Sequence, residues 1–243
     1  MDRYSQPYGQ PSNKNELDHW FDPGSRTLKE LRNLQETAIH NLDIVDGYGN
    51  IDRIAGTDCA YLDDRIVCVM VVLDYNSLEV IEKKYTVQKV VFPYIPTYLN
   101  FREGKAIAST FLELGNKPDI VMFDSCGVNH PTRAGMASYF GVVMDVPTIG
   151  VSKKILCGSS ETPVEVGESR KLIYNEEQVG WLLKSNKRSN PIIVAPGHKV
   201  SLESCLEIVK HCLKGYKLPE PTRLAHMYAN EVKKLASEEE VKE

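Results

Sequence analysis

The sequence contains no long hydrophobic run. Nowhere among its 243 residues do apolar side chains approach the ~18 consecutive positions that a bilayer-spanning helix requires. Residues 1–15 are polar and lack the apolar centre of a secretory signal. These absences argue against membrane insertion and secretion, and we expect a cytoplasmic protein.

Closely spaced cysteine pairs are also missing. None of the six cysteines forms a CxxC pair, and several lie inside apolar runs. This usage favours buried, reduced thiols over a disulfide framework or a zinc site.

Positive charge is not in excess. The chain has 29 lysines and arginines against 33 aspartates and glutamates, a formal net charge of -4. This balance argues against tight, indiscriminate binding to a phosphate backbone, although it leaves room for a local basic groove. We expect a monomer whose affinity for any nucleic acid is modest and salt-sensitive.

What is present is an ordinary globular composition, with 42% hydrophobic and 26% charged residues, and enough length for one substantial core. We predict a single domain over residues 23–236. The polar segment 1–22 is expected to lack stable order, and the acidic tail 237–243 is expected to fray.

The hydrophobic pattern changes period along this domain and predicts a mixed α/β fold. After a first amphipathic helix, three successive strands have links so short that they must pair antiparallel. A helix, a strand, a helix and another strand follow, an order that implies a parallel right-handed crossover. The predicted strands are 53–62, 66–74, 78–90, 120–123, 146–151 and 191–195, with a hairpin within 157–190, and the predicted helices are 25–40, 99–114, 132–144, 201–213 and one from Glu220.

Two aspartates stand where a folded chain does not readily hold a charge. Asp124 follows an apolar run at the carboxyl end of a strand, where α/β sheets bind their ligands, and Asp58 lies within the first strand. If these strands are neighbours, the carboxylates repel each other and a divalent cation relieves the repulsion. Simpler explanations exist, because Asp124 can cap a turn and Asp58 can lie at a bulge beside Gly56.

Other residues suit such a site but also have simpler roles. Glu103, in the first turn of a predicted helix, either complements the helix dipole or faces the aspartates. Together with His226 of the last helix, it can complete the outer coordination of a bound cation. Lys153 follows a strand directly, where a lysine either pairs with a phosphate or is simply a surface residue. The stiff segment 93–96 is either a wedge for stacked bases or a loop folded onto the core. The order of elements alone favours a ribonuclease H-like fold and a metal-dependent nuclease.

Four motifs carry the interpretation further. GTDCAY at 56–61, PYIPTYLNFRE at 93–103, DSCGVNHPTRAG at 124–135 and VPTIGVSKKILCG at 146–158 together resemble the endonuclease V family, with similarity over residues 28–235. The resemblance implies a ribonuclease H-like mixed sheet, three antiparallel strands followed by parallel strands, flanked by helices. It also implies Mg²⁺-dependent hydrolysis, with Mn²⁺ as a substitute, of the second phosphodiester bond 3′ to a deaminated base (inosine), which initiates repair and leaves 3′-hydroxyl and 5′-phosphate ends.

The same resemblance implies roles for individual residues. Asp58 and Asp124 correspond to the metal ligands, and Glu103 to a supporting carboxylate. The remaining catalytic positions are Lys153 beside the cleaved phosphate, His226, and His130 of the HP motif. The wedge that replaces an extruded base corresponds to Pro93, Tyr94, Ile95 and Pro96, and the base pocket to Leu99, Ser125, Gly127, Gly150 and Leu156.

One position departs from the family pattern. The family commonly has Asp-Gly-x-Gly where this chain has Asp124, Ser125, Cys126 and Gly127. A side chain at Ser125 narrows the base pocket or adds a hydroxyl to it, so the resemblance specifies base preference less firmly than phosphodiester cleavage.

Three alternatives stay open. The family includes DNA repair enzymes and inosine-specific endoribonucleases, so the natural substrate is DNA or RNA. A non-cleaving inosine-binding module is a second alternative, which the presence of all four of Asp58, Glu103, Asp124 and Lys153 opposes. In the third, Cys126 is a nucleophile with His130 as its base, and thiol alkylation rather than a chelator inactivates the protein.

Overall fold

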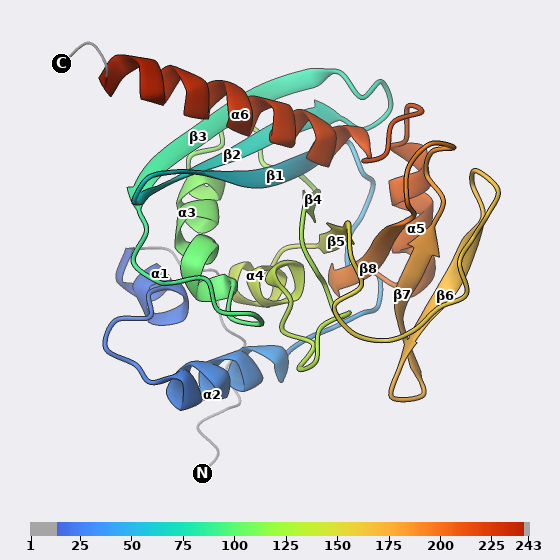
Figure 1. The fold of residues 1–243 in the computed structure, drawn as a ribbon, viewed down its shortest axis with the longest axis horizontal. Helices are drawn as coiled ribbons and strands as arrows, with labels where there is room; N and C mark the ends of the chain where they lie inside the picture. The colour runs from blue at the N-terminus through green and yellow to red at the C-terminus, as the bar shows by residue number, and fades with distance from the viewer. Residues whose placement is uncertain (1–13, 241–243) are drawn as a thin grey trace.

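Eight strands form one continuous sheet in the computed structural model, which describes residues 14–240 (Figure 1). The strands are β1 (Arg53–Leu62), β2 (Arg65–Asp74), β3 (Val80–Lys89), β4 (Ile120–Phe123), β5 (Thr148–Ser152), β6 (Ser169–Tyr174), β7 (Glu177–Leu183) and β8 (Ile192–His198). Their order in space is β3-β2-β1-β4-β5-β8-β7-β6. β4 pairs in parallel with both β1 and β5, and the other neighbouring strands pair antiparallel. The predicted mixed sheet is confirmed.

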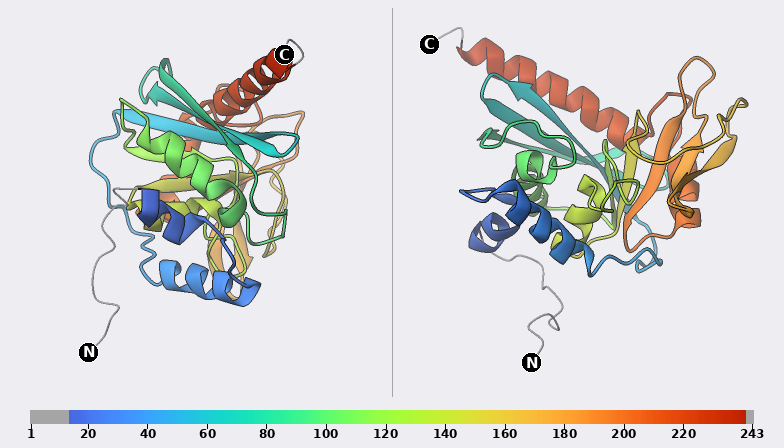
Figure 2. Two further views of the ribbon diagram at one scale, coloured as in Figure 1. Left: turned by 90° about the vertical axis from the view of Figure 1, so that its left-hand side faces the viewer. Right: turned by 60° about the horizontal axis from the view of Figure 1, so that its bottom comes forward.

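Helices cover both faces of this sheet (Figures 1 and 2). They are α1 (Lys14–Phe21), α2 (Leu28–Ile39), α3 (Asn100–Leu112), α4 (Met136–Met144), α5 (Leu202–His211) and α6 (Glu220–Glu240). The first four contribute to the core on one face, and α5 and α6 contribute to the core on the other. Within residues 14–240, no helix has both the length and the apolar character needed to cross a bilayer.

β2 lies where both faces of the sheet are covered. Its residues from Ile66 to Leu73 are at most 1% exposed, because α3 packs on one side and α6 on the other. This burial explains the unbroken apolar run in the sequence, since a strand covered on both faces needs no polar alternation.

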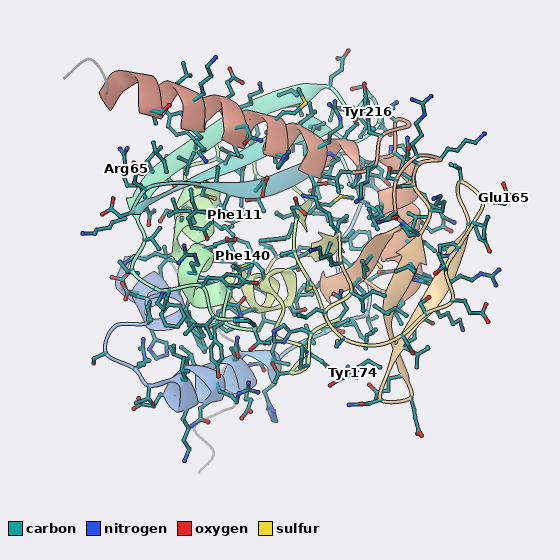
Figure 3. All side chains as sticks on the ribbon, in the orientation of Figure 1. Arg65, Phe111, Phe140, Glu165, Tyr174 and Tyr216 are labelled. Atoms are coloured by element: carbon teal, nitrogen blue, oxygen red, sulfur yellow. The ribbon has the colours of Figure 1, made fainter. Side chains whose placement is uncertain are left out.

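Aromatic rings fill the core between the sheet and helices α3 and α4. Phe111 and Phe140 meet edge to face, with ring centroids 5.7 Å apart, and both point into the interior (Figure 3). Phe123, the last residue of β4, packs against Phe140 at 5.1 Å. The end of β4 is therefore anchored by buried aromatic contacts, which fixes the point where the chain leaves the sheet.

The two ends of the chain differ from the prediction. Helix α1 occupies part of the segment 1–22 that was expected to lack order, while residues 1–13 lie outside the described range. α1 is ordered because Phe21 is fully buried on α3, where Gly104 has no side chain to block the ring. Helix α6 continues to Glu240, past the expected boundary at 236, and residues 241–243 are again outside the described range. The extent of the single domain stays a prediction.

Two predicted helices begin later than expected. α2 begins at Leu28 because Thr27 and Glu30 form a capping box, each side chain accepting from the other's backbone N–H. α4 begins only at Met136, so residues 124–135 form a loop instead of a first helical turn. This loop, which follows Asp124, builds much of the candidate site.

Candidate active site

Three side chains from distant parts of the chain meet where β4 ends beside β1. Thr57 of β1 pairs with Phe123, the last residue of β4, so the next residues, Asp58 and Asp124, lie side by side. His226 on α6 approaches from the other direction, with its Nδ1 2.7 Å from Asp58 Oδ2. One ligand atom from each of the three side chains lies within 4.8 Å of the others. The prediction that these two strands are neighbours is therefore confirmed.

The electrostatics of this cluster favour a cation. Burial, and then the negative charge of Asp124, raise the pKa of Asp58, whereas the contact with His226 lowers it. Side-chain exposure is 16% for Asp58 and 8% for Asp124, but 50% for His226, so the cluster is open to solvent on the α6 side. Two carboxylates and an imidazole are a donor set that fits a divalent cation.

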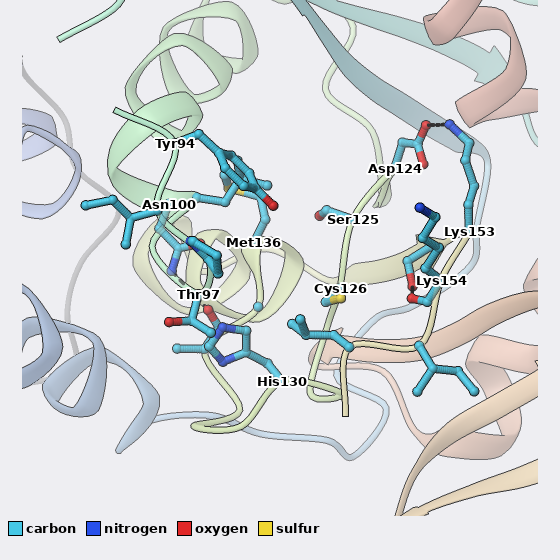
Figure 4. Close-up of a pocket in the computed structure, with 18 residues that line it drawn as sticks. Tyr94, Thr97, Asn100, Asp124, Ser125, Cys126, His130, Met136, Lys153 and Lys154 are labelled. Atoms are coloured by element: carbon cyan, nitrogen blue, oxygen red, sulfur yellow. Dashed lines mark hydrogen bonds and ion pairs between the residues drawn. The ribbon is translucent and has the colours of Figure 1, made fainter. Parts of the chain in front are cut away.

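Lys153 completes the charged group from the loop after β5. Its ammonium forms an ion pair with Asp124 Oδ2 (Figure 4). Its side chain is 40% exposed and rises along the edge of the site, so the positive charge is accessible from solution. Its position at the end of a strand, noted in the sequence, thus brings it to the carboxylates.

Glu103 reaches the same place from the first turn of α3. A small cavity is lined by Asp58, Glu103 and Asp124 together, although Glu103 is not one of the three clustered ligand residues. The hydroxyl of Tyr61 donates to Glu103 Oε1 at 2.6 Å. Burial raises the pKa of Glu103 to about 7, and the charge of Asp58 adds to the shift while the Tyr61 hydrogen bond opposes it.

A larger pocket of about 520 Å³ opens beside this cluster (Figure 4). Tyr94, Ile95 and Pro96 of the tip form one wall with Leu99, while the loop after β5 forms the facing wall with Leu156. Ser125 lies between the two walls and lines both this pocket and the small cavity. Tyr94 is 70% exposed, whereas Ile95 beside it is partly buried against the core. Its companion Pro93 is not among the lining residues.

Gly127 and Gly150, expected in the base pocket, do not line it and lie beneath it. A Cβ on Gly150 would lie 2.4 Å from the backbone nitrogen of Gly127, and a Cβ on Gly127 would lie 2.1 Å from the carbonyl oxygen of Pro196. The loop after β4 thus packs directly on the backbones of β5 and β8. These glycines support the pocket floor by permitting this close approach.

His130 is not brought to the carboxylates. It is 4% exposed in the pocket wall, where its Nδ1 lies 3.1 Å from Thr132 Oγ1, and burial lowers its pKa to about 4. Cys126 lines the same pocket, and burial raises the pKa of its thiol to about 11. Burial disfavours the thiolate that a cysteine nucleophile requires, which opposes the cysteine mechanism.

Sequence reasoning missed Tyr61 and Arg102. The Tyr61 hydroxyl donates to Glu103 Oε1 and accepts from Arg102 Nε. Strand alternation is the signal that was available, because residues 58 and 61 of one strand point to opposite faces. It indicates that Tyr61 faces α3 when Asp58 faces α6. It does not indicate which group on α3 the hydroxyl meets.

Paired carboxylates at the end of a central strand, with a lysine beside them, suit the hydrolysis of a phosphodiester bond with a bound cation. The fold and the site thus define a metal-dependent endonuclease. The Endonuclease V family profile matches residues 32–227, and Endonuclease V of Dictyoglomus thermophilum is 40% identical over 202 residues, 83% of this chain and 89% of that protein. The chain belongs to the endonuclease V family.

Solved structures agree with this assignment. Endonuclease V from Streptomyces avermitilis superposes with a TM-score of 0.82 at 30% identity, covering 96% of this chain and 100% of that one. A variant of Ciona intestinalis endonuclease V, crystallised with a 23mer DNA containing an inosine followed by a ribo-adenosine, superposes with a TM-score of 0.79 at 26% identity. That match covers 87% of this chain and 99% of the other.

Proposed function

We propose that this protein is a Mg²⁺-dependent endonuclease that binds inosine in nucleic acid and hydrolyses the second phosphodiester bond on its 3′ side, initiating repair. One observation carries the proposal: Asp124 and Ser125 line both the large pocket and the small cavity that contains Asp58 and Glu103. A base held in the pocket therefore keeps its own strand against the carboxylates.

The pocket has the properties that an extruded base requires. Its volume of about 520 Å³ lies within the range of small-molecule sites, and its walls combine apolar side chains with a few polar groups. The exposed ring of Tyr94, at the end of a stiff proline-flanked tip, can fill the gap that the base leaves in a duplex. Extrusion costs least for a mismatched base, which already favours inosine over normal pairs.

The charged residues take the roles of a phosphodiesterase. Asp58 and Asp124 would hold Mg²⁺, with His226 contributing from α6, and Mn²⁺ suits the same donors. When bound, such an ion activates water and stabilises charge at phosphorus. Lys153 offers an accessible ammonium to the substrate phosphate, and Glu103 is the supporting carboxylate. We assign His130 to the pocket wall because it lies away from these groups.

DNA is the favoured substrate, because a family member was crystallised with inosine-containing DNA. An inosine-specific endoribonuclease is the second candidate. It has a specific observation in its favour, since the nucleotide after the inosine in that DNA was a ribo-adenosine.

The proposal is tested with oligonucleotides that contain one inosine, prepared as single-stranded DNA, double-stranded DNA and RNA. We expect Mg²⁺-dependent cutting of the inosine strand and no cutting of the matched adenosine strand. The rate ratio decides between DNA and RNA. Binding of inosine strands without any cutting, at any Mg²⁺ or Mn²⁺ concentration, would instead establish the non-cleaving binding module.

A further inference from the structure

The hydroxyl of Tyr61 is held between two charged side chains. It donates to Glu103 Oε1 at 2.6 Å and accepts from Arg102 Nε at 3.0 Å. Because the arginine N–H occupies the oxygen's acceptor side, the hydroxyl hydrogen is directed at the carboxylate. The Arg102 guanidinium also lies over the Tyr61 ring, 4.5 Å from its centroid, which fixes the ring itself.

The same arginine reaches the root of the tip. Arg102 Nη1 donates to the carbonyl of Phe92, the residue directly before Pro93. The backbone N–H of Glu103 donates to the carbonyl of Leu99 at 3.0 Å, which is the first-turn bond of α3 itself. The Arg102 side chain therefore ties the start of the tip to Tyr61, whose hydroxyl holds Glu103.

Glu103 needs such support. Its side chain has several rotatable bonds, and it shares a small cavity with two other carboxylates, whose charges favour a conformation that turns it away. Asp58 is held by the contact with His226, and Asp124 by the ion pair with Lys153. Tyr61 supplies the corresponding hold on Glu103.

We propose that Tyr61 is a positioning residue: its hydroxyl fixes the Glu103 carboxylate in the active cavity and, through Arg102, links that carboxylate to the root of the base-replacing tip. The inference rests on the proposed function. It goes beyond that function by making the seating of the tip and the placement of a catalytic carboxylate parts of one network.

Tyr61→Phe tests the proposal, because it removes the hydroxyl and keeps the ring against Arg102. We expect kcat on the inosine strand to fall at least about tenfold, the loss expected for a hydrogen bond to a charged group, with KM unchanged. The matched control is Tyr139→Phe, a buried tyrosine of α4 whose hydroxyl donates to the Trp20 carbonyl at 2.6 Å. A purely structural role for Tyr61 predicts the same kcat for both variants, which would overturn the proposal.

The link to the tip has its own test. The losses in kcat/KM for Tyr61→Phe, Tyr94→Ala and the double variant form a cycle. A combined loss that differs from the product of the single losses supports the link, and a combined loss equal to the product overturns it. Failure of the unmutated protein to cut would overturn the proposed function and this inference with it, whereas unchanged kcat in Tyr61→Phe beside an active parent overturns only the inference.

Discussion

The imidazole of His226 lies 2.7 Å from Asp58 Oδ2, and this contact joins the last helix to the centre of the sheet. Gly56 permits it, since a Cβ there would lie 2.0 Å from the carbonyl oxygen of Pro221. The first turn of α6 therefore rests directly on the backbone of β1. The candidate metal site depends on this close packing between segments at opposite ends of the chain.

His226→Asn should weaken the affinity of the site for the metal ion without unfolding the protein. Losing the imidazole beside Asp58 should raise the Mg²⁺ concentration for half-maximal cutting by about 10- to 100-fold, as for other residues that orient metal ligands. A Mg²⁺ titration of cutting rate measures this. His211→Asn, on the surface of α5, is the control and should leave the titration unchanged. An unchanged titration for His226→Asn would remove His226 from the metal site.

Tyr94→Ala should affect duplexes more than single strands. The exposed ring replaces the extruded base only where a stack must be filled, and such stacking contributes about 1–3 kcal/mol. We expect kcat/KM on inosine duplexes to fall about tenfold and to change much less on single strands. Tyr85→Ala, another exposed tyrosine on the edge strand β3, serves as the control. Equal losses on both substrates would contradict the wedge.

Ser125 should control base preference. Its Oγ is buried and has no hydrogen-bond partner within the described part of the chain, so a bound base is expected to supply one. Ser125→Ala should lower kcat/KM for hypoxanthine about fivefold. Ser125→Gly should also widen the pocket and improve cutting at xanthine, which carries a further exocyclic oxygen. A hypoxanthine-to-xanthine ratio that is the same in all three proteins would exclude a role for this side chain.

The free energy of unfolding should decrease as the pH is lowered, partly because of His130. Burial lowers its pKa from 6.5 to about 4. Between these values the unfolded chain binds a proton that the folded chain does not, so the stability that neutral His130 contributes is present above pH 6.5 and is lost as pH falls toward 4. The loss should reach about 3 kcal/mol. Urea unfolding of the parent and of His130→Gln at pH 7 and 4.5 isolates this contribution, because the other groups are common to both. Equal losses would contradict it.

The sequence predicts most of the fold because its strongest signals are local. The apolar runs in β2 and β4 and the short links between β1, β2 and β3 restrict the pairing, and the order of crossovers then makes β1 and β4 neighbours. The first helix was missed because its signal is short, and its order comes from Phe21 packing against Gly104 of a distant helix.

Only part of the candidate site can be predicted from the sequence. Charged residues at strand ends, such as Asp124 and Lys153, can be recognised in the sequence because burying a charge needs compensation. The role of Gly127 cannot be recognised in this way, because it depends on Pro196, which contacts Gly127 only in the folded sheet. The role of Tyr61 cannot be predicted for the same reason, since its partner on α3 is set by tertiary packing.

The most direct test of the account is to map the cut to the nucleotide. The protein is incubated with Mg²⁺ and an end-labelled strand containing one inosine, with the parent protein in EDTA and Asp124→Asn in Mg²⁺ as controls. The account predicts a single cut at the second phosphodiester bond 3′ to the inosine, absent in both controls. A cut at any other bond, or the same cut by Asp124→Asn or in EDTA, would contradict it.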